Sequence, residues 1–167
     1  MPVYLKAQEV GADRDMLGFP QSALGLGVVA ITAAGLFGVH LEAIDPAVRD
    51  AAVLALRDHM ARHRAGPILA LYGSCHHAGR YAGAANRLAA WQAEMEGVAG
   101  LLGAWHGPAR GCNTGFIEPR EGTTIEYRPD YGAGRCRIEY RRAAATPAGQ
   151  GQPHEIDDAT RLLEFVV

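Results

Sequence analysis

The stretch from Met16 to Leu41 contains no Asp, Glu, Lys or Arg, so it is either a membrane span or part of a buried core. Five glycines and Pro20 interrupt it, and β-branched residues cluster around Val28-Val29. Buried strands have this texture, because they appear as short apolar runs separated by glycine, and no basic flank supports a membrane span. We therefore expect two buried antiparallel strands, 24–32 and 36–43, and no membrane association.

The composition is that of an ordinary folded protein. The chain has 167 residues, 49% of them hydrophobic, with 16 Lys+Arg against 18 Asp+Glu and a net charge of −2. A chain of this length buries enough surface to form a core without disulfides or a metal, which excludes a disordered protein. The near-neutral charge balance removes the electrostatic argument for a nucleic-acid partner, so we expect none.

The three cysteines, Cys75, Cys112 and Cys136, are widely spaced and form no C-x-x-C motif. This pattern fits neither a disulfide framework nor a closed zinc site, so reduced thiols are expected. No basic segment leads into an apolar core at the N-terminus, so no signal peptide is predicted. The expected location is the cytoplasm.

Two helices are predicted in the middle of the chain. Asp45 is a good N-cap and Pro46 suits the first helical position, where no N–H is needed, so a helix should run to about His63. A second helix is expected at 84–102, and its three glycines at 97, 100 and 103 either weaken its last turns or allow close packing on a sheet. The short apolar segment 67–72 between the helices suits a buried strand.

The C-terminal third predicts a β-hairpin. Segments 123–128 and 135–141 alternate, share the tetrapeptide Ile-Glu-Tyr-Arg and flank a turn at 129–134. One set of alternate residues should face the core: Ile125, Tyr127, Cys136, Ile138 and Tyr140. The other set should face water: Glu126, Arg135, Arg137, Glu139 and Arg141. The hairpin arginines either form an anion-binding surface or pair with the glutamates across the strands, and we favour the pairing.

The remaining segments carry weaker signals. A first strand is expected within 2–10, a tight turn at 111–115 should enter a strand at 116–117, and 144–154 reads as a flexible loop. The last segment forms either a short helix capped by Asp157 or Asp158, or an edge strand at 161–167. No linker divides the chain, so we predict one α+β domain over residues 1–167, with a mostly antiparallel sheet packed against two main helices.

The most suggestive residues for chemistry are Cys75, His76 and His77, which follow a predicted buried strand. A thiol at the end of a strand is well placed to be a nucleophile, and a nearby histidine would lower its pKa and act as general base. A productive base usually comes from another element, which makes His40 and His106 candidates as well. The alternative is that Cys75 is a small buried residue and the histidines belong to a polar loop, which we favour because free cysteine is usually buried.

Other site motifs are weak. His59 and His63 lie one helical turn apart, but neither they nor the Cys75 segment supplies the three or four convergent ligands that zinc needs, so no metal and no cofactor is predicted. Ser22 and Ser74 lack the G-x-S-x-G frame of a nucleophile elbow. The glycines around Leu26 lack the remainder of a phosphate-binding motif.

The segment from Leu24 to Ile31, followed by Gly38-Val39-His40-Leu41, resembles the chemoreceptor glutamine deamidases and, more distantly, the cytotoxic-necrotizing-factor deamidases. In those families one strand carries a nucleophilic cysteine and the next ends in the catalytic histidine, and helix, strand, helix and a closing β segment follow. The resemblance covers about residues 20–142 and rests on element order. It implies a role for His40, but this chain has no cysteine near Gly27, where the family has its nucleophile. Under this resemblance, either the chain has lost the deamidase chemistry or Cys75 enters the same pocket from a neighbouring strand.

We therefore expect a binding or interaction domain whose partner is another protein or a second copy of the chain. The alternative is a thiol amidohydrolase or deamidase that uses Cys75 with His40, His76 or His77. The enzyme hypothesis requires Cys75 to lie within hydrogen-bond reach of a histidine in an accessible pocket. The binding hypothesis expects a buried or unpartnered Cys75 and an exposed apolar patch elsewhere.

Overall fold

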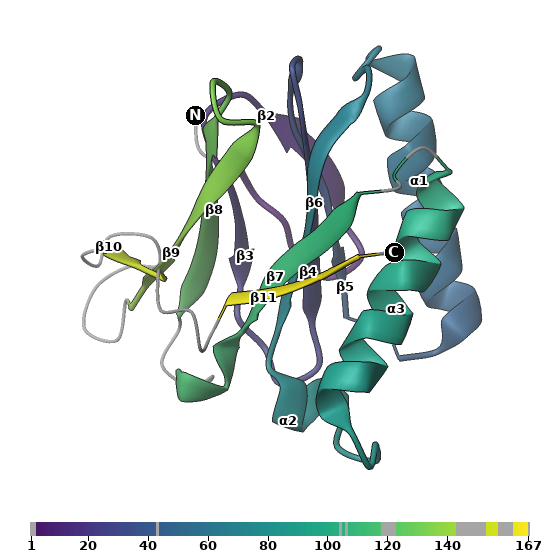
Figure 1. Cartoon of the computed structure of the whole chain (residues 1–167), viewed down its shortest axis with the longest axis vertical. Coiled ribbons are helices and arrows are strands. Elements are labelled where there is room, and N and C mark those ends of the chain that lie inside the picture. The colour runs from purple at the N-terminus through teal and green to yellow at the C-terminus, as the bar shows by residue number, and fades with distance from the viewer. Residues whose placement is uncertain are drawn as a thin grey trace.

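The computed structural model describes residues 3–42, 44–103, 105, 107–117, 123–142, 153–156 and 162–166. Within these residues the strands form a five-stranded sheet and a six-stranded sheet, and the helices cover the outer face of the six-stranded sheet (Figure 1). The fold class is α+β, as predicted. The strands are mostly antiparallel, and they divide between two sheets that pack face to face.

The five-stranded sheet has the order β1-β3-β8-β9-β10. Its strands are β1 (Val3–Tyr4), β3 (Leu17–Pro20), β8 (Thr124–Asp130), β9 (Arg135–Arg141) and β10 (Pro153–Glu155). All its pairings are antiparallel except β1 with β3.

The six-stranded sheet has the order β11-β7-β6-β4-β5-β2. Its strands are β2 (Val10–Asp13), β4 (Leu26–Thr32), β5 (Gly35–Leu41), β6 (Ile68–Cys75), β7 (Pro108–Asn113) and β11 (Leu162–Val166). The predicted hairpin is present as β4 and β5, which pair antiparallel along their whole length. The uncharged run therefore forms strands of the two sheets. No helix in the described part of the chain is long and apolar enough to cross a membrane.

Helix α1 (Pro46–Arg62) begins where the sequence predicts it. The Asp45 side chain accepts a hydrogen bond from the backbone N–H of Ala47 at 2.9 Å, and Pro46 occupies the first turn. Helix α3 (Arg87–Leu102) begins slightly later than expected, after Asn86 as N-cap, and ends at Gly103 with φ of 79°. The short helix α2 (His77–Arg80) was not predicted.

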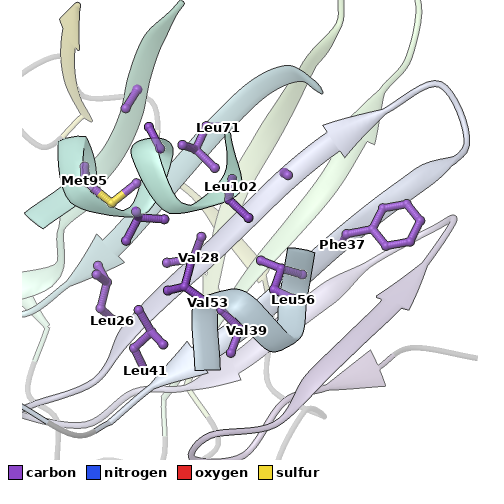
Figure 2. Close-up of a cluster of buried hydrophobic side chains, with 14 of the residues drawn as sticks. Leu26, Val28, Phe37, Val39, Leu41, Val53, Leu56, Leu71, Met95 and Leu102 are labelled. Carbon is purple, nitrogen blue, oxygen red and sulfur yellow. The ribbon is translucent and has the colours of Figure 1, made fainter. Parts of the chain in front are cut away.

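Two hydrophobic clusters fill the space between the layers. One lies between the six-stranded sheet and the helices, where Figure 2 shows Val53 and Leu56 of α1 and Met95 of α3 beside the strand residues. The other lies between the two sheets. The six-stranded sheet is buried on both faces, which explains why β4 and β5 read as continuous apolar runs.

The C-terminal hairpin forms as β8 and β9, and the predicted inward residues pack in the cluster between the sheets. The outward set differs from the prediction, because Glu126 is fully buried and Glu139 is 8% exposed. Arg141 Nε donates to Glu126 Oε2 at 2.9 Å and Arg128 Nε to Glu139 Oε2 at 3.0 Å. The favoured cross-strand pairing is confirmed, and the arginine side chains shield the carboxylates from water.

Of the remaining predictions for single segments, some are confirmed and others are wrong. A 3-10 turn at Thr114–Phe116 replaces the strand expected at 116–117, and the expected first strand is two separate strands, β1 and β2. The C-terminal segment is an edge strand, β11, which pairs with β7. Residues 143–152 and the predicted caps at 157 and 158 lie outside the described residues. Residues 153 and 154, which the sequence predicts to belong to the loop, are in strand β10.

The glycines of α3 do not pack on the sheet. A Cβ at Gly97 or Gly100 would meet nothing within 4 Å, and both residues are exposed. The close approach occurs on the sheet side instead, where a Cβ at Gly111 would lie 1.8 Å from the Gly73 carbonyl oxygen and 3.0 Å from the Trp91 ring. Small residues on β6 and β7 therefore allow α3 to lie close to the sheet.

We expect Gly100→Ala to raise the free energy of unfolding by about 0.5–1 kcal/mol, because alanine loses less backbone entropy in a helix and has free space here. Urea unfolding followed by circular dichroism measures the change. The control is Gly111→Ala, which should destabilise the protein because its Cβ collides with backbone. Equal effects of the two substitutions would contradict the assignment of free space at Gly100.

Candidate functional site

One edge of the six-stranded sheet is formed by the ends of its inner strands: β4 begins there, and β5 and β6 end there. Leu26 pairs with Leu41 on one side and Cys75 on the other, and Gly27 pairs with His40 and with Ser74. Helix α2 and the 3-10 turn Thr114–Phe116 lie near the same edge, at the lower end of Figure 1. This edge brings together most of the residues that the sequence singles out.

The pleat places Cys75 and His40 on opposite faces of the sheet. Cys75 belongs to the cluster beneath the helices, whereas the His40 ring contacts Phe19 of the other sheet, with ring centroids 5.5 Å apart. The strands that carry them are separated by β4, which places the backbones about two strand spacings, or 10 Å, apart. Both residues border one small pocket, but no hydrogen bond joins the Cys75 thiol to His40 in the part of the chain that the structure describes, so the structure does not pair them as a nucleophile and its base.

The surroundings of Cys75 are those of a core residue. Its side chain is 3% exposed, and no hydrogen bond joins its thiol to a histidine among the residues described. Burial raises the pKa of the thiol well above its ordinary value, against smaller opposing effects of the Tyr81 hydroxyl and the Arg80 guanidinium. A thiol in such an environment is inert rather than nucleophilic.

We expect Cys75 to resist alkylation by iodoacetamide in the folded protein between pH 5 and pH 9, and to react readily in denaturant. Mass spectrometry of each cysteine-containing peptide measures the rates. Cys136 is the internal control, because it alone of the three thiols is partly exposed and should be modified first. Labelling of Cys75 faster than Cys136 in the native state would contradict this description.

His76 and His77 have structural surroundings. His76 is the N-cap of α2, and its Nδ1 accepts a hydrogen bond from Gly79 N–H at 3.0 Å. His77 is 4% exposed and stacks on Trp91 with ring centroids 5.9 Å apart. Its Nε2 has no hydrogen-bond partner among the residues described, and burial is the main cause that lowers the pKa of His77 to about 4.

The buried His77 makes stability depend on pH. Its pKa is about 4 when folded and about 6.5 when unfolded, so the unfolded chain binds more protons and stability falls as pH drops from 6.5 to 4. We expect His77→Phe, which keeps a ring against Trp91, to remove about 2 kcal/mol of the stability loss between pH 7 and pH 4.5. Urea unfolding at the two pH values measures it, and an unchanged difference would contradict the assignment.

His40 lies beside a small pocket between the sheets. The ring is 4% exposed, and its Nδ1 lies 2.9 Å from the carbonyl oxygen of Leu5. A pocket of about 20 Å³ is bordered by His40, Ser22, Gln21 and Thr114, among others. Burial lowers the pKa of His40, and the hydrogen bond to Leu5 and the Glu42 carboxylate oppose that effect.

Gln21 leaves a polar atom unsatisfied at this pocket. Its Nε2 donates to Thr114 O at 3.1 Å and to Thr114 Oγ1 at 2.9 Å. Its Oε1 is buried and has no hydrogen-bond partner within the described part of the chain. Ser74, by contrast, is closed off, because its hydroxyl bonds the Tyr127 hydroxyl and receives Cys112 Sγ–H at 3.3 Å. The pocket is therefore polar on the Ser22 side and sealed on the Ser74 side.

A buried ion pair fixes the same edge to the helix layer. Arg80 is 5% exposed, and its Nε and Nη2 donate to the two carboxylate oxygens of Glu94 at 2.6 and 2.9 Å. Its Nη1 donates to the carbonyl oxygens of Leu24 and Leu41. Burial acts to raise the pKa of Glu94, but the hydrogen bonds and charge of Arg80 hold it below its ordinary value. One guanidinium thus connects the ends of β4 and β5 to α3.

Metal ligands do not converge in the described part of the chain, where no group of three or more His, Cys, Asp or Glu is arranged around a common point. His59 and His63 lie close, with ring centroids 4.3 Å apart, but no third ligand joins them. His106 lies outside the described residues.

Sequence reasoning did not identify the residues that packing, and not a sequence motif, brings together at this edge. Arg80 is the last residue of α2 and Glu94 lies within α3. Neither residue belongs to a sequence motif. Ser22 lacks the frame of a nucleophile elbow, and the segment between β3 and β4 places it beside Gly25 and the pocket that His40 also borders. The chain matches no protein-family model, no curated protein and no solved structure.

Proposed function

We propose that this protein is a binding domain that docks a protein partner with the end of the molecule where β4 begins. The supporting observation is the placement of its exposed apolar side chains. Four of the five large ones in the described residues lie near this end: Leu24, Ile44, Val48 and Leu88, which are 40–55% exposed. Scattered exposed apolar residues are ordinary, whereas residues gathered at one end are typical of an interaction site.

Chain connectivity explains why these side chains gather. Leu24 precedes β4, and Ile44 and Val48 follow β5, whose end pairs with the start of β4. Leu88 is in the first turn of α3, which follows the end of β6 and the short helix α2. A groove of about 340 Å³ between α1 and α3, lined in part by Ile44, Arg49 and Glu94, lies beside them. Apolar anchors around a groove with charged walls suit a protein surface better than a lipid.

The geometry does not favour the thiol amidohydrolase or deamidase hypothesis. Cys75 is buried, and no histidine among the described residues bonds its thiol. The His40 side chain projects from the opposite face of the sheet. The binding hypothesis requires this arrangement of Cys75. We therefore retain binding as the proposed role.

Site-specific photocrosslinking tests the docking surface. With p-benzoylphenylalanine at Val48, we expect a crosslinked adduct in cells of the organism that makes the protein. The control position is Arg62, which is exposed on nearly the same face of α1 but about 21 Å further along the axis. We expect no such adduct from that position.

A second pair of substitutions tests the surface itself. Ile44→Asp and Leu88→Asp should abolish the Val48 adduct without changing the melting temperature, since both side chains are exposed. The adduct mass distinguishes a second copy of the 17.8 kDa chain from another protein. Equal adducts from both probe positions, or an adduct that survives the double substitution, would overturn the proposal.

A further inference from the structure

Gly25 separates two reactive side chains at the pocket between the sheets. The point where a Cβ of residue 25 would stand lies 2.4 Å from His40 Nε2 and 2.6 Å from Ser22 Oγ. Both side-chain atoms therefore lie beside this glycine, and both side chains border the same pocket. Any larger residue at position 25 would occupy the space between them.

The hydrogen bonds define the proton positions of both groups. A carbonyl oxygen only accepts, so the contact with Leu5 O at 2.9 Å places the His40 proton on Nδ1 and leaves the lone pair on Nε2. Ser22 Oγ accepts from Gly25 N–H at 2.8 Å and keeps its own hydrogen to donate. A hydroxyl donor and an unprotonated imidazole nitrogen thus border one pocket, and a small movement of the Ser22 side chain would form the hydrogen bond that activates a serine.

Glu42 supplies a negative charge beside the His40 ring. Its carboxylate lies 3.6 Å from His40 Nε2, and its charge favours the imidazolium that forms when this nitrogen takes up a proton. Leu5 holds the opposite nitrogen and thereby the ring orientation. Leu5 O thus orients the ring from the opposite nitrogen, as the orienting partner does in known nucleophile pairs, whereas Glu42 would stabilise the protonated form from the side of Nε2.

We propose that Ser22 and His40 form a nucleophile and general-base pair that cleaves esters of small acyl groups. Ser22 Oγ bonds to the ester carbonyl carbon as its proton moves to His40 Nε2. The bond between that carbon and the alcohol oxygen then breaks, and the alcohol leaves with the proton. Water repeats the sequence, which releases the carboxylic acid and restores Ser22. This inference goes beyond the proposed docking and does not depend on it.

The pocket sets the size of the acyl group. Its volume of about 20 Å³ has room for a group of the size of one water molecule. Gln21 Oε1, which has no partner among the residues described, accepts a hydrogen bond and so favours a donor there, such as the attacking water, over an alkyl chain. The pocket therefore favours a formyl group most and disfavours acyl groups increasingly as the chain lengthens.

Labelling with a small fluorophosphonate tests the nucleophile. Ser22 Oγ should displace fluoride from phosphorus and transfer its proton through His40 to water, and peptide mapping should place the adduct on Ser22. His40→Asn keeps a donor for Leu5 O and removes the base, so it should slow labelling about 100-fold. Gly25→Ala puts a methyl group between the pair and should slow labelling to a similar extent. p-Nitrophenyl acetate should be hydrolysed faster than the butyrate, and Ser22→Ala should abolish this hydrolysis.

A thiol replacement keeps the test decisive if the fluorophosphonate is too large for the pocket. In Ser22→Cys, the introduced thiol should react with iodoacetamide at neutral pH faster than Cys136, and adding His40→Asn should remove that advantage. Circular dichroism identifies variants that fail to fold. Labelling that persists in Ser22→Ala, or an introduced thiol whose rate does not respond to His40→Asn, would overturn the proposal.

Discussion

The alternation of β4 is the constraint on which the other layers depend. This strand lies inside the six-stranded sheet with a partner on each side, and successive residues point to opposite faces. Leu26 and Val28 therefore belong to the core beneath the helices, and Val29 and Ile31 to the core between the sheets. A slip of one residue would exchange both cores at once. The register of β4 also decides which face each neighbouring side chain occupies, which is why Cys75 and His40 are kept apart.

The buried Arg80–Glu94 pair makes the edge at the start of β4 rigid. A charge pair removed from water is stabilising only if its remaining donors and acceptors are satisfied. Here the guanidinium also donates to Leu24 O and Leu41 O, and Tyr81 donates to Glu94 Oε1 at 2.7 Å. The pair thus holds the backbone at Leu24, next to Gly25, and at Leu41, next to His40. Pocket geometry at a strand edge would otherwise depend on loops, which are more mobile than strands.

The sequence predicts local structure well and spatial neighbours poorly. Asp45-Pro46 marks a helix start and the alternation of 135–141 marks a strand, because both signals arise from residues close in the chain. The burial of Glu126 depends on Arg141 and on Tyr4, whose hydroxyl donates to it at 3.0 Å across the sheet. Such partners are set by strand order, which no local pattern encodes. Ser22 and His40 border one pocket because of the path of the segment between β3 and β4, which no local pattern encodes either.

The resemblance to glutamine deamidases stays a prediction, and the packing around Gly27 bears on how this chain would use His40. The resemblance places a nucleophile near Gly27, in register with His40. In this chain the Phe19 ring lies 2.9 Å from the point where a Cβ at residue 27 would stand, so an apolar ring fills that position. The polar approach to His40 Nε2 lies on the Gly25 side, where Ser22 stands. Chemistry at this histidine therefore depends on the segment that precedes β4 and not on the strand itself.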